Sequence, residues 1–270
     1  MIDVRDLWPD DILDRFPRKL WSLGRWILRK DYKKATWALS NCDGILAVSQ
    51  GFLKWGLNYT KREQSNKDRV FYLGVNFSSP QKESYQSQAS EKLAKDIENK
   101  KVFVFLRAFG RSYKILLVAQ AAKVIFNSGR EDIHFILAGT GENFDRVQEA
   151  SSQLPNFSLT GWLKKDDISL LLSKSYVGLT PCNSKPNTIN NNPIQYFTYG
   201  LPIISSLVGE MSEMLEKDQL GFSYLLGDYN ALVKLILHFA DSPKLKNEIS
   251  INVQKVYSER FKAETIYRKY

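Results

Sequence analysis

Cysteine and histidine are scarce in this sequence of 270 residues, which contains two of each. Cys42 and Cys182 are too few for a disulfide framework or a multi-cysteine metal site. His134 and His238 cannot form a histidine-clustered metal centre, and we expect them to be packed or surface residues rather than catalysts. Low cysteine use is typical of a reduced compartment, so the sequence predicts a cytoplasmic location.

Long apolar runs are missing as well. A membrane-spanning helix needs about 18 consecutive apolar residues, and no window of the sequence provides them. Asp3, Arg5 and Asp6 follow Met1 at the place where a secretory signal would be apolar. We therefore expect neither a membrane span nor an export signal.

Positive charge is present in excess, because 38 basic residues stand against 29 acidic ones and give a net charge of +9. The excess is concentrated in residues 15–34, where eight basic residues accompany the single acid Asp31. Such an excess indicates an anionic partner, for which nucleic acid, a membrane surface and a phosphorylated small molecule all qualify.

The same segment carries apolar residues at helical spacing. Phe16, Leu20, Leu23 and Ile27 recur at four-three-four intervals, and three tryptophans surround them: Trp21, Trp26 and Trp37. This pattern is typical of a helix on an anionic membrane surface, so we predict that residues 15–37 lie at the inner face of the cytoplasmic membrane. The alternative is a core-facing helix with a solvated basic back. Nucleic acid ranks last, because the segment resembles no known reader motif.

A composition shift divides the chain. Residues 78–98 are polar and predict a linker with a short helix near 90–97. The regions predicted around this linker are a partial amino-terminal domain at 1–77, a second domain at 99–250 and a helical tail at 251–270.

Short apolar runs alternate with amphipathic stretches in the second domain, which indicates βαβ units and a parallel sheet. The first region repeats the pattern with fewer strands and a mostly helical stretch at 8–37. Strands are predicted at 2–4, 45–48, 70–73, 102–106, 133–138, 157–160, 176–180 and 203–206, and helices at 113–126, after 142, near 166–173 and at 193–199.

Ligands of such sheets bind at the carboxyl ends of the strands, so the loops there are the candidate site. The loop after the 102–106 strand carries cations that suit a diphosphate, and Gly139 and Gly141 follow the next strand and allow a close backbone approach. A solvated basic loop is the alternative for these cations, which are Arg107, Arg111 and Lys114.

Two further loops complete the candidate site. Trp162 and Leu163 follow the third strand, where the ring suits a planar base or serves as a lid on the core. Asn192 is a good N-cap before Pro193, and the Gln195 amide on the first helical turn can hydrogen-bond a ribose hydroxyl. The alternative is an asparagine-rich surface turn.

The order of these motifs resembles that of the group 1 (family 4) glycosyltransferases of the GT-B fold, in the branch that builds bacterial capsule, O-antigen and exopolysaccharide. The landmarks run in the family's order over nearly the whole chain: VRDLWPD (4–10), NCDGILAVSQGF (41–52), DRVFYLGVN (68–76), FGRSY (109–113), ILAGTGEN (136–143), LTGWL (159–163) and PIQYFTYGLPIISS (193–206).

The resemblance implies an α/β fold with a Rossmann-like carboxyl-terminal domain and an incomplete Rossmann-like amino-terminal portion. It also implies a retaining hexosyltransferase that uses a UDP- or GDP-linked sugar without cofactor or metal. The absence of any Asp-x-Asp motif agrees with a reaction that needs no metal.

The resemblance also implies the roles of the site residues. By the resemblance Arg111 and Lys114 bind the donor pyrophosphate and the Trp162 loop lies on the nucleobase. The helix near Pro193 then binds the sugar and phosphate, together with Thr188, Ile189 and Asn192.

The sequence departs from the family in three places. Asn187 and Gln195 stand where the family usually has two glutamates, and these amides add no negative charge to the implied catalytic pair. Asn192 stands at a usual lysine and Arg107 at a usual glycine. The family's acceptor-side glycine loop and its histidine would precede Met1. We therefore expect an amino-terminal part that a second chain supplies or that has been lost by truncation, and little transferase activity from this chain alone. The alternative is a non-catalytic relative that binds nucleotide sugars or acts as a scaffold.

Overall fold

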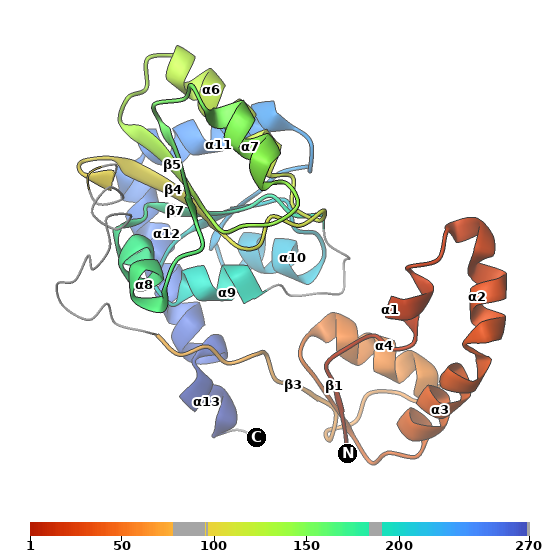
Figure 1. Ribbon diagram of the computed structural model, residues 1–270. Helices are drawn as coiled ribbons and strands as arrows, with labels where there is room; N and C mark the ends of the chain where they lie inside the picture. The colour runs from red at the N-terminus through yellow and green to blue at the C-terminus, as the bar shows by residue number, and fades with distance from the viewer. Residues whose placement is uncertain (78–94, 96, 184–190, 269–270) are drawn as a thin grey trace. The chain divides into compact units, whose positions relative to one another are not determined.

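The computed structural model describes residues 1–77, 95, 97–183 and 191–268. The chain divides into two compact units, one formed mainly by Met1–Leu73 and one by the described residues from Gly74 to Tyr267 (Figure 1). The predicted linker at 78–98 lies for the most part outside the described residues, and so do Asn187, Thr188 and Ile189.

The first unit contains a parallel sheet of order β1-β2-β3. Its strands are β1 (Ile2–Val4), β2 (Ile45–Ala47) and β3 (Arg69–Val70). Helix α4 (Gln50–Thr60) begins where the Ser49 hydroxyl accepts a hydrogen bond from the Phe52 N–H, and it packs on the sheet. The core of this unit is built from Val4, Leu7, Leu39, Ile45, Ala47, Phe52 and Leu53.

The stretch predicted to be mostly helical, 8–37, is divided into several short helices. These are α1 (Asp10–Leu13), the 3-10 turn η1 (Arg18–Leu20), α2 (Trp21–Ile27) and α3 (Arg29–Ser40). Pro17 separates α1 from η1 because its ring cannot continue a helix, and Leu28 leaves the helical conformation between α2 and α3. The Asp10 carboxylate joins these helices to α4, because it accepts hydrogen bonds from Tyr32, Trp55 and Tyr59.

The second unit contains a six-stranded parallel sheet of order β6-β5-β4-β7-β8-β9. Its strands are β4 (Lys101–Leu106), β5 (Ile133–Ala138), β6 (Phe157–Gly161), β7 (Val177–Thr180), β8 (Ile203–Ser205) and β9 (Gly221–Ser223). All six residues of β5 are buried, as expected for a strand covered on both faces. Strands β4 to β8 agree with the predicted ones, whereas the sequence gives no signal for β9, which is short and begins with a glycine.

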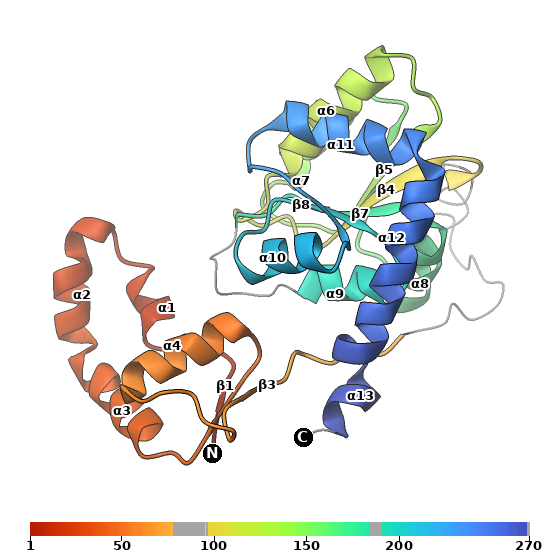
Figure 2. The same ribbon diagram turned by 180° about the vertical axis from the view of Figure 1, so that it is seen from behind.

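Helices cover both faces of this sheet, with α6, α7 and α11 on one side and α8, α9 and α10 on the other (Figures 1 and 2). Their bounds are Ile115–Asn127 for α6, Phe144–Ser151 for α7, Lys165–Lys174 for α8, Asn191–Phe197 for α9, Glu210–Lys217 for α10 and Tyr229–Asp241 for α11. The chain ends with α12 (Pro243–Val256), the π-helical turn η2 (Tyr257–Phe261) and α13 (Ala263–Tyr267).

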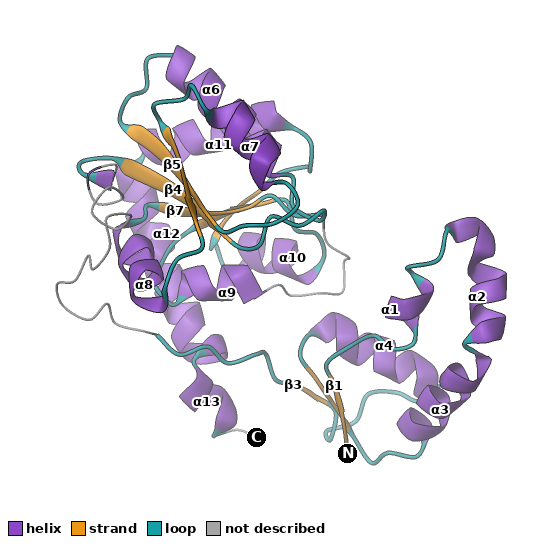
Figure 3. Cartoon of the chain, in the orientation of Figure 1, coloured by secondary structure: helices purple, strands orange, loops and turns teal. Residues whose placement is uncertain are grey.

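The strand order changes direction between β4 and β7, because β5 and β6 extend the sheet on one side while β8 and β9 extend it on the other. Such a switch point leaves a crevice at the carboxyl ends of the two central strands, where α/β proteins bind ligands. Figure 3 shows three of the strands, β5, β4 and β7, next to one another. Backbone hydrogen bonds join the loops that follow β4, β5, β6 and β7 at this edge, from Arg107 N–H to Ala138 O, from Gly139 N–H to Gly161 O and from Lys114 N–H to Pro181 O.

One buried carboxylate orders the loop before β3 in the first unit. Asp68 forms a two-pronged ion pair with Arg62 at 2.6 and 2.8 Å and accepts N–H donors from Ile45 and Ser65. The Arg62 guanidinium, helped by these backbone donors, lowers the pKa of Asp68 well below its ordinary range. Because the folded pKa is depressed, Asp68 contributes stability above the unfolded pKa of about 3.9, and this contribution is lost as the pH falls further.

We therefore expect Asp68→Asn to destabilise the first unit by about 2 kcal/mol at pH 7, the scale of hydrogen bonds to a charged group. The difference between the variant and the parent should shrink below about pH 4. Urea unfolding followed by tryptophan fluorescence measures this, since five of the six tryptophans lie within residues 1–73. Asp43→Asn, at an exposed aspartate, is the control. An Asp68→Asn variant with the parent's stability at pH 7 contradicts the assignment.

Candidate functional site

The two central strands of the second unit separate before they end. β4 pairs with β5 along all six of its residues but with β7 only at Phe103↔Val177 and Val104↔Gly178. The carboxyl ends of β4 and β7 are therefore not paired with each other, and Leu106 at the end of β4 lines the switch-point crevice.

A cavity of about 320 Å³, here called the crevice pocket, lies at these strand ends. It brings together five of the predicted site residues, Arg107, Gly139, Trp162, Leu163 and Gln195, although they are spread over almost 90 positions of the chain. Its other lining residues are Leu106, Ala108, Ala138 and Ile168. The Trp162 side chain is 79% exposed, so its ring is accessible to a planar ligand.

Backbone contacts fix the wall formed by the loops after β4 and β5. The Arg107 N–H donates to Ala138 O and the Phe109 N–H to Thr140 O. Gly139 has φ +145°, and a Cβ there would lie 2.0 Å from the Arg107 carbonyl oxygen. Gly139 thus joins the two loops to each other, and a close approach of its backbone to a ligand stays a prediction.

Helix α9 forms the opposite wall through Gln195. It begins at Asn191, two residues earlier than predicted, so Asn192 lies inside its first turn instead of capping it. The Asn192 side chain is 2% exposed, and its amide nitrogen and oxygen have no hydrogen-bond partner among the residues that the structure describes. The buried Thr180 hydroxyl at the end of β7 likewise has none. Such unpaired buried groups are costly, and a bound polar ligand is one way to satisfy them.

Arg111 and Lys114 line a different cavity, of about 530 Å³, here called the cationic pocket. Arg146 from α7 adds a third cation that the sequence analysis did not single out, because its only signal was its place on the first turn after the β5 loop. Arg111 forms an exposed ion pair with Glu142 at 2.8 Å. The structure thus separates Arg111 and Lys114 from Arg107, which lines the crevice pocket.

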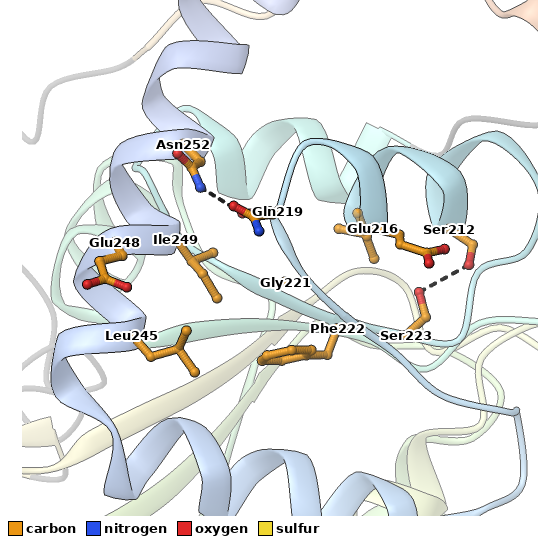
Figure 4. A pocket seen from close by; sticks show the side chains of 11 residues that line it. Ser212, Glu216, Gln219, Gly221, Phe222, Ser223, Leu245, Glu248, Ile249 and Asn252 are labelled. Atoms are coloured by element: carbon orange, nitrogen blue, oxygen red, sulfur yellow. Dashed lines mark hydrogen bonds between the residues drawn. The ribbon is translucent and has the colours of Figure 1, made fainter.

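A further cavity of about 490 Å³ lies between α10, β9 and α12 (Figure 4). Leu245 and Ile249 provide its apolar side, and Glu216 and Glu248 lie at its edge. None of the described site residues predicted from the sequence lines it.

The basic segment of the first unit exposes large apolar side chains. Leu20, Leu23, Trp26 and Ile27 are 45, 50, 62 and 52% exposed. The Arg29 guanidinium lies over the Trp26 ring, 4.8 Å from its centre. The core-facing alternative therefore does not describe these four side chains.

Both histidines are structural. His134 is buried and forms a hydrogen bond with Ser158, and His238 packs against Phe222. Within the described residues, no group of three or more histidine, cysteine or acidic side chains is placed to hold a metal ion. The helices of the described part of the chain are all too short or too polar to cross a membrane.

More than half of the chain, residues 100–242, matches the family described as glycosyl transferases group 1. No curated protein matches the chain.

Solved structures share the fold at low sequence identity. HepE from Anabaena in complex with UDP is 18% identical, with a TM-score of 0.69 over 89% of this chain and 66% of HepE. A glycosyltransferase from Rickettsia africae is 17% identical, with a TM-score of 0.69 over 94% of this chain and 65% of that protein. S. aureus TarM in a complex containing UDP is 14% identical, with a TM-score of 0.64 over 89% of this chain and 45% of TarM.

The chain thus spans 66%, 65% and 45% of these three proteins. The predicted fold class, α/β of GT-B type with parallel sheets, is confirmed.

The close contact between Gly139 and the Arg107 carbonyl oxygen leads to a prediction about the stability of the second unit. Gly139→Ala should destabilise the second unit by about 3 kcal/mol, because it adds a backbone clash to the strain of a positive φ. Gly129→Ala is the matched control, since Gly129 has φ +78° and no atom within 4 Å of its Cβ position. That variant should lose only about 1 kcal/mol. Urea unfolding followed by circular dichroism compares them, and equal losses contradict the contact.

Proposed function

Because the chain belongs to the group 1 glycosyltransferases, we propose that it binds the nucleotide diphosphate of a sugar donor in the crevice pocket. The observation that carries this proposal is the meeting of Arg107, Gly139, Trp162 and Gln195 around one cavity at the switch point. The reaction is transfer of the sugar to a lipid-linked or glycan acceptor in the assembly of a bacterial surface polysaccharide.

Each lining residue has a role that suits its chemistry. The exposed Trp162 ring and the backbone at Gly139 and Leu163 receive the nucleobase, and the Gln195 amide hydrogen-bonds a ribose hydroxyl. Arg107 pairs with the pyrophosphate at the mouth of the pocket. UDP in the complexes of HepE and TarM favours uridine over guanosine as the nucleoside.

We propose that Arg111 and Lys114, which line the cationic pocket, also bind a phosphate group of the donor. The Arg111–Glu142 pair is solvent-exposed, and such pairs contribute little stability, so a phosphate can replace the carboxylate at small cost. Two backbone bonds, Lys114 N–H to Pro181 O and Asn183 N–H to Ser112 O, join this loop to the residues after β7. The loop is therefore held at the switch point.

The proposed transfer retains the anomeric configuration. The bond between the anomeric carbon and the phosphate oxygen breaks, and the acceptor oxygen forms a new bond on the same face of the sugar. The leaving phosphate takes the acceptor's proton, so no separate base is required of this unit.

Gln195 and Asn187 favour a second candidate, a relative that binds nucleotide sugars without transferring them. An amide accepts hydrogen bonds from sugar hydroxyls but places no negative charge beside the positive charge that develops on the sugar in the transition state. Nucleotide binding without transfer, even with an acceptor-side partner present, would support this candidate.

We further propose that a second polypeptide completes the acceptor side by pairing with the first unit. β1 is an edge strand of the described sheet, and its residues line a cavity of about 530 Å³ together with residues of α3 and α4. Ile2, Val4, Ala35, Leu39 and Trp55 give this cavity apolar walls. An added strand would cover this edge and fill the cavity.

Nucleotide binding tests the site. Arg107→Ala should weaken UDP binding by about tenfold or more in calorimetric titrations, because a charge-assisted contact to phosphate is lost. Binding of uridine, which has no phosphate, should not change. Lys123→Ala, at an exposed cation in the middle of α6, is the control. If Arg107→Ala binds UDP as tightly as the parent, the pyrophosphate does not lie where we propose.

The exposed apolar residues of 15–37 support the proposal of a peripheral membrane location. Peripheral binding needs buried apolar area and electrostatic attraction to anionic lipids. Leu23 and Trp26 supply the apolar area when they enter the lipid interface, and the neighbouring cations contact the anionic headgroups. Arg25 and Arg29 are the nearest of these cations in the sequence.

The double variant Leu23→Ser with Trp26→Ser should reduce binding to phosphatidylglycerol-containing vesicles by about tenfold or more, measured by co-sedimentation. Val124→Ser removes an apolar side chain of similar exposure from α6 and should bind as the parent does. Binding to pure phosphatidylcholine should be weak throughout. Unchanged binding of the double variant to the anionic vesicles would rule out this surface.

A further inference from the structure

The ladder between β4 and β7 stops one hydrogen bond short of the strand ends. With Val104 opposite Gly178, the next bond of a parallel ladder would run from the Leu106 N–H to the Leu179 carbonyl oxygen. In the structure this bond is replaced. The Leu106 N–H donates to the Tyr196 hydroxyl at 2.9 Å, and that hydroxyl donates to Leu179 O at 3.3 Å.

The Tyr196 side chain is built into this position. It is completely buried, and burial raises the pKa of its hydroxyl, so the group stays protonated and able to donate. Gly178 leaves room for the ring, since a Cβ at Gly178 would lie 2.4 Å from the Tyr196 Cδ2 atom. A single hydroxyl group therefore lies between the two backbones and keeps them apart.

This separation occurs at the wall of the crevice pocket. Leu106 is the last residue of β4 and is followed directly by Arg107 and Ala108, all three of which line the pocket. Tyr196 is also the immediate neighbour of Gln195 on α9. The Tyr196 side chain thus positions both walls of the pocket, the one that carries Arg107 and the one that carries Gln195.

We propose that Tyr196 is a positioning residue that sets the width of the switch-point crevice and, through it, the affinity for the donor nucleotide. This inference rests on the proposed function. Without the hydroxyl, the Leu106 N–H loses its hydrogen-bond partner, and we expect it to move toward Leu179 O and to displace residues 106–108.

The test compares two tyrosine-to-phenylalanine variants. Tyr196→Phe removes the hydroxyl between the strands. Tyr176→Phe is the matched control, because the Tyr176 hydroxyl also donates to a backbone carbonyl, Phe239 O, but does not line the pocket. Each variant is titrated with UDP by calorimetry, and its thermal unfolding is recorded.

We expect Tyr196→Phe to bind UDP about tenfold more weakly than the parent and Tyr176→Phe to bind as the parent does. Equal affinity of Tyr196→Phe and the parent would overturn the proposal. Equal weakening of both variants would also overturn it, because the loss would then follow stability rather than crevice width.

Two measurements keep the outcome separate from the proposed function and from folding. If the parent does not bind UDP, the proposed function fails. The conformation of the crevice walls is then compared between the variants by the NMR signals of the Trp162 indole and the Ala108 amide. A change in these signals in Tyr196→Phe but not in Tyr176→Phe supports the positioning role, and no change overturns it. If Tyr196→Phe does not fold, UDP is titrated into the isotope-labelled parent protein. A Leu106 amide NMR signal that does not change on addition of UDP then overturns the positioning role of Tyr196.

Discussion

The Tyr196 hydroxyl, buried between the Leu106 N–H and the Leu179 carbonyl oxygen, is the contact on which the candidate site depends. If the two strands paired to their ends, the Leu106 N–H would bond directly to Leu179 O, and residues 106–108 would lie closer to β7. Because the Tyr196 hydroxyl interrupts the ladder, the two central strands separate at Leu106, although their loops join again through the bonds from Lys114 N–H to Pro181 O and from Asn183 N–H to Ser112 O. The wall of the pocket at residues 106–108 thus depends on the sheet, and the loops after β5 and β6 supply further lining residues.

The loops then become fixed walls through contacts that only particular residues permit. Gly139 comes so close to the Arg107 carbonyl that no side chain fits, and the Asn143 amide donates to the Phe109 and Gly110 carbonyl oxygens. Arg107 is therefore held at the pocket by backbone geometry. The buried Asn192 amide differs from these groups, because it lines none of the cavities and has no hydrogen-bond partner within the described residues.

The sequence predicted the parallel sheet and its strands β4 to β8 because runs such as 133–138 are apolar and bounded by turns. It also predicted that Arg107, Gly139, Trp162 and Gln195 meet, since all four follow strands of one sheet. It could not predict which cations share a pocket, because Arg107 and Arg111 belong to one loop whose path depends on contacts with Gly139 and Asn143. Tyr196 was not recognised either, since a tyrosine in a helix pattern looks like any core aromatic residue.

A crystal structure of the chain with UDP tests the central claim most directly. The account predicts the uracil against Trp162 and Gly139, the ribose at Gln195 and the pyrophosphate at Arg107, with the Tyr196 hydroxyl still bonded to Leu106 and Leu179. UDP bound only in the cationic pocket, or in the cavity between α10 and α12, would contradict the account. So would a complex in which β4 and β7 pair directly at Leu106.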